Sequence, residues 1–223
     1  MHIVIPTTKP EDWKRLLAKA SHWKAGHSAM ALAQCWEANK RGGMPPEVQH
    51  ILPDATALIA IPELKVDLPP KGGRPSQTDL FVLAREPQGL VAITVEGKVE
   101  ESFGPTLGER RQDRSSGVKT RIDFLLKTLG LSQGVPENIR YQLLHRTVSA
   151  VLSAQSFGAR RAVMLVHSFS PGGTWYDDFA AFAGLFGIAA NKEVELPAGK
   201  VDGVDLSLAW CTGSTRFLRR LTP

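Results

Sequence analysis

Two carboxylates and a lysine stand at spacings that suit metal-assisted hydrolysis. Asp79 comes directly before one apolar run, and Glu96 and Lys98 stand two residues apart near the end of the next. Hard divalent cations prefer carboxylate oxygens as ligands, and a lysine beside them can orient or polarise a water molecule. This set therefore predicts a divalent-metal site that activates water.

These three side chains can converge only if two neighbouring strands position them. Segments 78–84 and 90–99 have strand patterns, and a short turn separates them. In 90–99 alternate residues are apolar, while Glu96 and Lys98 share the opposite face. An antiparallel hairpin brings Asp79 to the end of the strand that carries this pair. The alternative is a solvated amphipathic strand in which Glu96 and Lys98 form only a salt bridge.

The other periodic segments give an order of helix, three strands, helices, strand, helix and strand. We expect a short helix over 10–20 and a clearer one over 28–40. The remaining predicted elements are strands 56–67, 161–167 and 204–211, and helices 119–129, 137–156 and 175–187.

The acidic pair, the lysine and the element order resemble the PD-(D/E)xK nuclease superfamily, which has the restriction-endonuclease-like fold. Asp79 matches the first acid of that signature, and Glu96 and Lys98 match its last two positions. Two positions depart from the pattern: Pro75 lies four residues before the acid instead of next to it, and Gly97 stands between Glu96 and Lys98. The resemblance covers about residues 28–211 of a chain that we expect to form a single domain, 1–223.

This resemblance implies an α/β fold with an αβββαβ core, in which helices flank a central mixed sheet. It also implies Mg²⁺ or Mn²⁺ held by Asp79 and Glu96, with Lys98 acting on the attacking water, and hydrolysis of phosphodiester bonds in nucleic acid. One alternative is an inert nucleic-acid-binding or protein-interaction module on the same fold, and another is an unrelated α/β sandwich.

The predicted helix 28–40 offers a candidate for a third carboxylate of the metal site. Met30, Ala33 and Glu37 share one helical stripe, where an unpaired carboxylate is costly. In several branches of the superfamily a glutamate of the first core helix completes the metal site, and Glu37 resembles it. The alternative is a boundary glutamate whose carboxylate reaches water. Glu63, after the first strand, is a weaker candidate.

Substrate contacts are expected in two places. Gln142 resembles by position a glutamine that contacts substrate in RecB-like members, where a tyrosine stands at the position of Arg146. The basic stretch 109–121 follows the predicted site and suits phosphate contacts, although such loops are often only solvated. Its candidate residues are Arg110, Arg111 and Arg114.

Composition and charge limit the class of partner. The 223-residue chain has a net charge of +5 and a pI near 9.4, which permits an anionic partner. We expect nucleic acid, DNA before RNA, and no membrane; a homodimer is compatible. Cys35 and Cys211 lack metal-ligand spacing and indicate a reducing compartment. With no signal-like or membrane-spanning segment, we expect a cytoplasmic protein.

Overall fold

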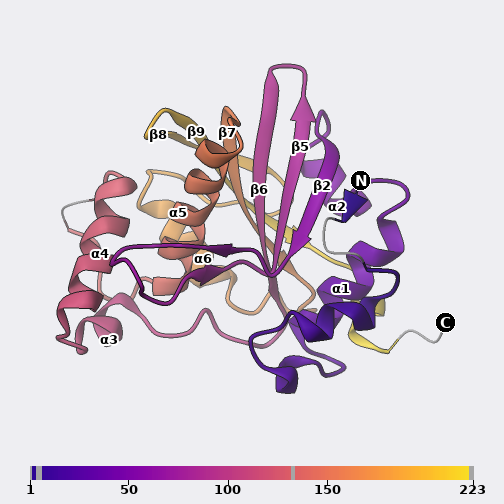
Figure 1. Cartoon of the computed structure of the whole chain (residues 1–223), viewed down its shortest axis with the longest axis horizontal. Helices are drawn as coiled ribbons and strands as arrows, with labels where there is room; N and C mark the ends of the chain where they lie inside the picture. The colour runs from indigo at the N-terminus through magenta and orange to yellow at the C-terminus, as the bar shows by residue number, and fades with distance from the viewer. Residues whose placement is uncertain (1, 4–6, 132–133, 221–223) are drawn as a thin grey trace.

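A mixed sheet forms the centre of the computed structural model, which describes residues 2–3, 7–131 and 134–220 (Figure 1). Its strand order is β1-β2-β5-β6-β7-β9-β8. These strands are β1 (His2–Ile3), β2 (Thr56–Pro62), β5 (Leu80–Glu86), β6 (Gly89–Lys98), β7 (Arg161–Ser168), β8 (Glu195–Val201) and β9 (Val204–Thr212). Two further short strands, β3 (Lys65–Val66) and β4 (Ser76–Gln77), pair with each other outside this sheet.

Helices cover both faces of the sheet (Figure 1). One face packs against α1 (Ser28–Asn39) and α2 (Pro46–Ile51), and the other against α4 (Ser116–Thr128), α5 (Tyr141–Ser156) and α6 (Tyr176–Gly184). The short α3 (Leu107–Arg111) precedes α4. The predicted α/β class, with helices flanking a central mixed sheet, is confirmed. In the parts of the chain that the structure describes, no helix combines the length and apolarity needed to cross a bilayer.

Strand β6 lies at the centre because its sequence suits burial on both faces. Val91, Ile93 and Val95 point into the core beneath α1 and α2, and Ala92 points into the core beneath α5. β6 pairs antiparallel with β5 and parallel with β7. The parallel pairing requires a long crossover, which α4 and α5 supply. As a result the first turn of α5 lies over the end of β6.

Most of the predicted elements occur near their expected positions, and the misses have identifiable causes. Segment 10–20 contains one short 3-10 helix, Pro10–Arg15, and a second, Ala20–His22, begins at its end. The predicted strand 56–67 breaks at Glu63 into β2 and β3. The short helix α2 was not predicted; it begins at Pro46, and a proline fits the first turn of a helix. Strand β8 was not predicted: Pro197 and Gly199 interrupt its alternation at a bulge.

Candidate functional site

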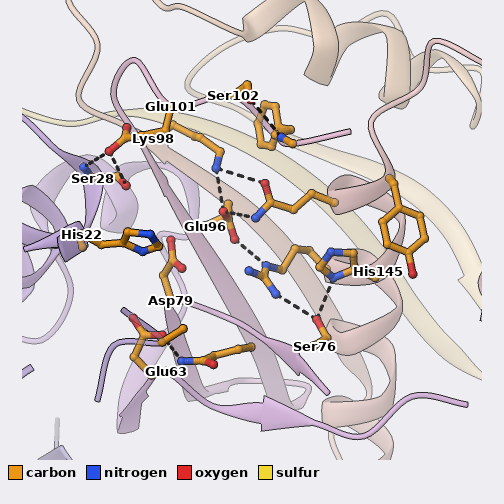
Figure 2. A pocket seen from close by; sticks show the side chains of 18 of the residues that line it. His22, Ser28, Glu63, Ser76, Asp79, Glu96, Lys98, Glu101, Ser102 and His145 are labelled. Atoms are coloured by element: carbon orange, nitrogen blue, oxygen red, sulfur yellow. Dashed lines mark hydrogen bonds and ion pairs between the residues drawn. The ribbon is translucent and has the colours of Figure 1, made fainter. Parts of the chain in front are cut away.

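The β5–β6 hairpin brings Asp79 to the end of β6 that carries Glu96 and Lys98. Leu80 pairs with Val95, so Asp79, one residue before β5, lies beside Glu96. The N–H of Gly97 donates a hydrogen bond of 2.8 Å to Asp79 Oδ2. These three predicted side chains line one pocket of about 630 Å³, and Figure 2 shows them facing the same space.

Glycine at position 97 leaves room for the acid. A β-carbon there would already be in contact with Asp79 Oδ2 and Leu32 Cδ2, each at 3.4 Å. A larger side chain would have to displace the carboxylate or the α1 residue beneath it. The departure from the superfamily pattern at this position therefore has a local packing reason.

Glu96 is the most enclosed carboxylate of the pocket, and both of its oxygens accept hydrogen bonds. Oε1 accepts from Lys98 Nζ at 2.8 Å and from Gln142 Nε2 at 2.7 Å, and Oε2 accepts from Arg146 Nε at 2.6 Å. Gln142 Oε1 accepts from Lys98 Nζ at 3.2 Å, which closes a ring of contacts between β6 and α5. Burial raises the pKa of Glu96, but Arg146 and Lys98 outweigh it and lower that pKa to about 2.

Arg146 connects this ring to a second layer of polar side chains. Its Nη1 donates to Ser76 Oγ at 3.0 Å, and Ser76 Oγ lies 2.9 Å from His145 Nδ1. Burial lowers the pKa of Arg146, and the charges of Glu96 and Asp79 more than restore it. Burial and the adjacent Arg146 hold the pKa of His145 well below its usual value, so this imidazole is neutral. Ser76 could not be placed here from the sequence.

Glu63 is the third carboxylate of the pocket, at the turn between β2 and β3. Its φ of 56° lies in the left-handed region, where a residue with a β-carbon is strained. Its N–H donates to the Asp79 carbonyl at 3.0 Å, and Gln77 Nε2 donates to its Oε2 at 2.6 Å. Figure 2 shows its side chain on the same side of the pocket as Asp79. The sequence identified Glu63 only as a weaker candidate, because the strained turn that aims it leaves no periodic signal.

Asp79 and Glu63 hold their protons far more tightly than ordinary carboxyls. Burial and the neighbouring Glu96 charge raise the pKa of Asp79 to about 7. Burial and the Asp79 charge raise the pKa of Glu63 to about 8. The charges of Arg146 and Lys98 act against this rise at Asp79, but both side chains bind Glu96 directly, so Asp79 and Glu63 are less well compensated than Glu96.

These two acids have the free oxygens that a hard cation needs. Among the residues that the structure describes, none donates a hydrogen bond to Asp79 Oδ1 or Glu63 Oε1. Mg²⁺ is commonly bound through one or two carboxylates while it keeps water or phosphate oxygens. Asp79 and Glu63 therefore fit a divalent cation, and Glu96 can join only through lone pairs left over from its three hydrogen bonds.

A family model described as Domain of unknown function (DUF6946) matches residues 6–215. The chain belongs to this family. No curated protein and no solved structure matches it. The description of the DUF6946 family names no activity, so the function of this member has to be argued from the pocket itself.

In this DUF6946 protein, Glu37 lies outside the pocket and is engaged elsewhere. Its Oε1 accepts hydrogen bonds from Trp13 Nε1, at 2.8 Å, and from the Thr7 hydroxyl, and its Oε2 lies 2.6 Å from Lys40 Nζ. Glu37 is 7% exposed and does not line the pocket. The helical stripe predicted its burial correctly, but the compensating charge is Lys40. The structure does not bring Glu37 to the pocket of Asp79 and Glu96, where Glu63 is a further carboxylate.

The predicted substrate contacts divide between the pocket and the solvated surface. Gln142 and Arg146 line the pocket, although both are bound to Glu96. Of the three arginines expected to contact phosphate, Arg110 lines the pocket, whereas Arg111 pairs with Glu137 and Arg114 is exposed away from it. The three arginines therefore do not form one continuous surface for phosphate contacts.

A second group with metal-ligand chemistry joins α1, α2 and β7. Ligand atoms of Cys35, Glu47 and His167 lie within 4.8 Å of one another. Trp36 Nε1 donates to His167 Nδ1 at 3.3 Å, so Nε2 carries the ring proton and donates to Glu47 Oε1, also at 3.3 Å. Burial raises the pKa of Cys35, which keeps the thiol protonated. A metal here would have to displace the protons of the thiol and of Nε2. Since both protons are engaged with Glu47, we interpret this group as a structural hydrogen-bond network.

The environment of Glu37 predicts a structural phenotype. Glu37→Gln removes the charge that Lys40 and Trp13 engage and should lower the free energy of unfolding by about 1–3 kcal/mol. Because Glu37 lies outside the pocket, calorimetric titration with Mn²⁺ should give the same affinity as for the wild-type protein. A weaker Mn²⁺ affinity with unchanged stability would return Glu37 to the metal site.

Proposed function

We propose that this protein is a metal-dependent nuclease of the PD-(D/E)xK type, which hydrolyses phosphodiester bonds of nucleic acid. The observation that carries the proposal is the meeting of Asp79, Glu96, Lys98 and Gln142 in one pocket. The element order α1-β2-β5-β6-α5-β7, with β2, β5 and β6 antiparallel and β7 parallel to β6, supports a restriction-endonuclease-like core.

The charge of the pocket supports a requirement for a cation. Three carboxylates that shift one another's pKa, Glu63, Asp79 and Glu96, are opposed by two cations, Lys98 and Arg146. With all five ionised, this group at the floor has one negative charge in excess; the other arginines that line the pocket, Arg74, Arg110 and Arg121, lie outside the group. A bound divalent cation reverses this sign, and Asp79 with Glu63, assisted by Glu96, would hold it. When bound, Mg²⁺ or Mn²⁺ supplies Lewis-acid stabilisation of charge on the phosphate oxygens.

Lys98 is held in a fixed position from which it can orient a water molecule. Its ammonium group has three N–H donors. Glu96 and Gln142 accept two of them, and the Phe103 ring lies 4.7 Å away, so the group is fixed with one donor unassigned. That donor can bind the attacking water or an oxygen of the reacting phosphate. Fixed donors of this kind need no reorganisation during the reaction, which is why they contribute strongly to catalysis.

A non-catalytic nucleic-acid-binding module is the competing function, and one contact favours it. Arg146 binds Glu96 Oε2 at 2.6 Å and supplies permanent positive charge at the site. A guanidinium there can hold phosphate by charge alone, without a metal and without turnover. In that case binding to nucleic acid would survive removal of divalent cations, whereas in the nuclease it would be coupled to them.

Substitutions in the pocket separate these functions. Asp79→Asn, Glu96→Gln and Lys98→Met should each lower Mg²⁺- or Mn²⁺-dependent cleavage of labelled oligonucleotides by at least about 100-fold. Asp79→Asn should leave the melting temperature unchanged or raised, because it removes a carboxyl that burial disfavours as a charge. Glu37→Gln, a buried glutamate outside the pocket, is the matched control and should still cleave. If the wild-type protein cleaves no DNA or RNA with either metal, the nuclease proposal is wrong.

The raised pKa values predict how metal binding depends on pH. Asp79 and Glu63 titrate near pH 7 and 8 in the folded chain, against about 3.9 and 4.3 when unfolded. Between these pH values the folded chain binds more protons at the two acids than the unfolded chain does. Without metal, their contribution to the free energy of unfolding is therefore complete below about pH 4 and is lost as the pH rises toward 8. Glu96, whose folded pKa is about 2, has the opposite sign, and its contribution is lost only as the pH falls below about 4.

A divalent cation must displace the protons on Asp79 and Glu63, so its affinity should increase with pH. The rise in melting temperature on adding Mg²⁺ should therefore be larger at pH 8 than at pH 6. Glu63→Gln removes one of the two titrating carboxyls and should weaken this dependence. If Mg²⁺ raised the melting temperature equally at both pH values, the cation would have to bind elsewhere.

A further inference from the structure

The reacting groups of the pocket lie at its floor. Glu96 and Lys98 are only 3% and 4% exposed. One wall of the pocket comes from the segment before α1, which contributes His22, and the opposite wall comes from α5, which contributes His145; Figure 2 shows these two side chains on opposite sides. A phosphate in a base-paired duplex is held by its neighbours at the surface of a wide cylinder. A strand that has left the duplex can follow the floor between the two walls more closely, so the recessed site favours unpaired nucleic acid.

The α5 wall carries an aromatic surface at the level of the pocket. Tyr141, the first residue of α5, is half-buried and lines the pocket. The Arg110 guanidinium carbon lies 5.7 Å from the centre of the Tyr141 ring. Apart from its contacts with Tyr141, Arg110 forms an exposed ion pair, 3.4 Å long, with Asp113. The planar guanidinium group thus packs on the Tyr141 ring and is only weakly held. A nucleobase could stack on the guanidinium or take its place on the ring.

Positive charge surrounds the same ring. The pKa of the Tyr141 hydroxyl is raised by burial, and the charges of Arg121 and Arg110 act against that rise, so both guanidinium groups lie near it. Arg121 is fixed, because it donates to three backbone carbonyls, those of Leu68, Pro69 and Arg74. Arg110 has no such anchor. The wall therefore combines a stacking surface, one immobile positive charge and one adjustable arginine, which is the combination that single-strand binding sites use.

We propose that the pocket takes an unpaired strand of nucleic acid, with Tyr141 stacking a base next to the scissile phosphate and Arg110 contacting the adjoining backbone. This inference rests on the proposed nuclease function and names its substrate class. The scissile phosphate then lies at the floor, where the carboxylates would hold the divalent cation that binds it. A flanking base occupies the aromatic wall, and a blunt duplex is a poor substrate.

The test compares one labelled sequence as a single strand, as a blunt duplex and as a duplex with a single-stranded tail, each cleaved by the wild-type protein with Mn²⁺. We expect kcat/KM for the single strand and the tail to exceed that of the blunt duplex by at least about tenfold, a stacked base alone contributing about 5- to 150-fold. Equal rates on all three substrates would overturn the inference while leaving the nuclease function intact.

Two variants of Tyr141 test the stacking surface itself. Tyr141→Leu should raise KM for the single strand by about 5- to 150-fold, whereas Tyr141→Phe keeps the ring and should stay close to the wild-type value. The melting temperature of each variant checks folding. A raised KM in both variants would assign the effect to the hydroxyl. An unchanged KM in both would mean that Tyr141 does not contact the substrate. Both results contradict the inference.

Binding measurements distinguish failure of this inference from failure of the nuclease function. Lys98→Met retains all pocket carboxylates, so fluorescence anisotropy with this variant and Mg²⁺ measures binding without turnover. Tight binding of the single strand together with an inactive wild-type protein would reject hydrolysis and retain the strand preference. Absence of both binding and cleavage on every substrate would reject the two proposals together.

Discussion

The site depends on one constraint, the burial of the Glu96 carboxylate at the end of β6. A buried charge is tolerated only when charged and polar partners surround it. Lys98 on the same strand supplies one cation, and Gln142 and Arg146 on α5 supply the remaining contacts. The first turns of α5 must therefore lie over the end of β6, which fixes how the crossover between β6 and β7 is placed. The packing of α5 on the sheet and the geometry of the pocket therefore both depend on the contacts of Glu96.

Because Lys98 and Arg146 bind Glu96 directly, Asp79 and Glu63 are less well compensated than Glu96. Burial and the neighbouring carboxylates raise the pKa of both acids, and the backbone at Glu63 lies in the strained left-handed region. A structural role alone would favour a polar or apolar residue at these positions. Paired acids with free oxygens, enclosed next to a fixed ammonium group, are instead suited to a divalent cation and a phosphate.

The sequence predicted the parts of the site that follow strand periodicity. Alternation along 90–99 located Glu96 and Lys98, and the short turn before it placed Asp79 opposite them. Glu37 was misplaced because a helical stripe predicts burial but not the partner, which is Lys40. Glu63 depends on a left-handed turn, and strand β8 on a bulge, and neither leaves a periodic signal. Arg146 was predicted to touch substrate, but only the fold reveals that it binds Glu96.

The central claim is that Asp79 belongs to a divalent-cation site at the floor of this pocket. Anomalous diffraction from crystals soaked in Mn²⁺ tests it most directly, because the manganese signal locates the ion without reference to activity. We predict a peak bonded to an Asp79 oxygen at about 2.0–2.2 Å, the spacing of a compact octahedral oxygen site, with Glu63 or Glu96 as a second ligand. A peak at Cys35, Glu47 and His167, or no peak in the pocket, would contradict the account.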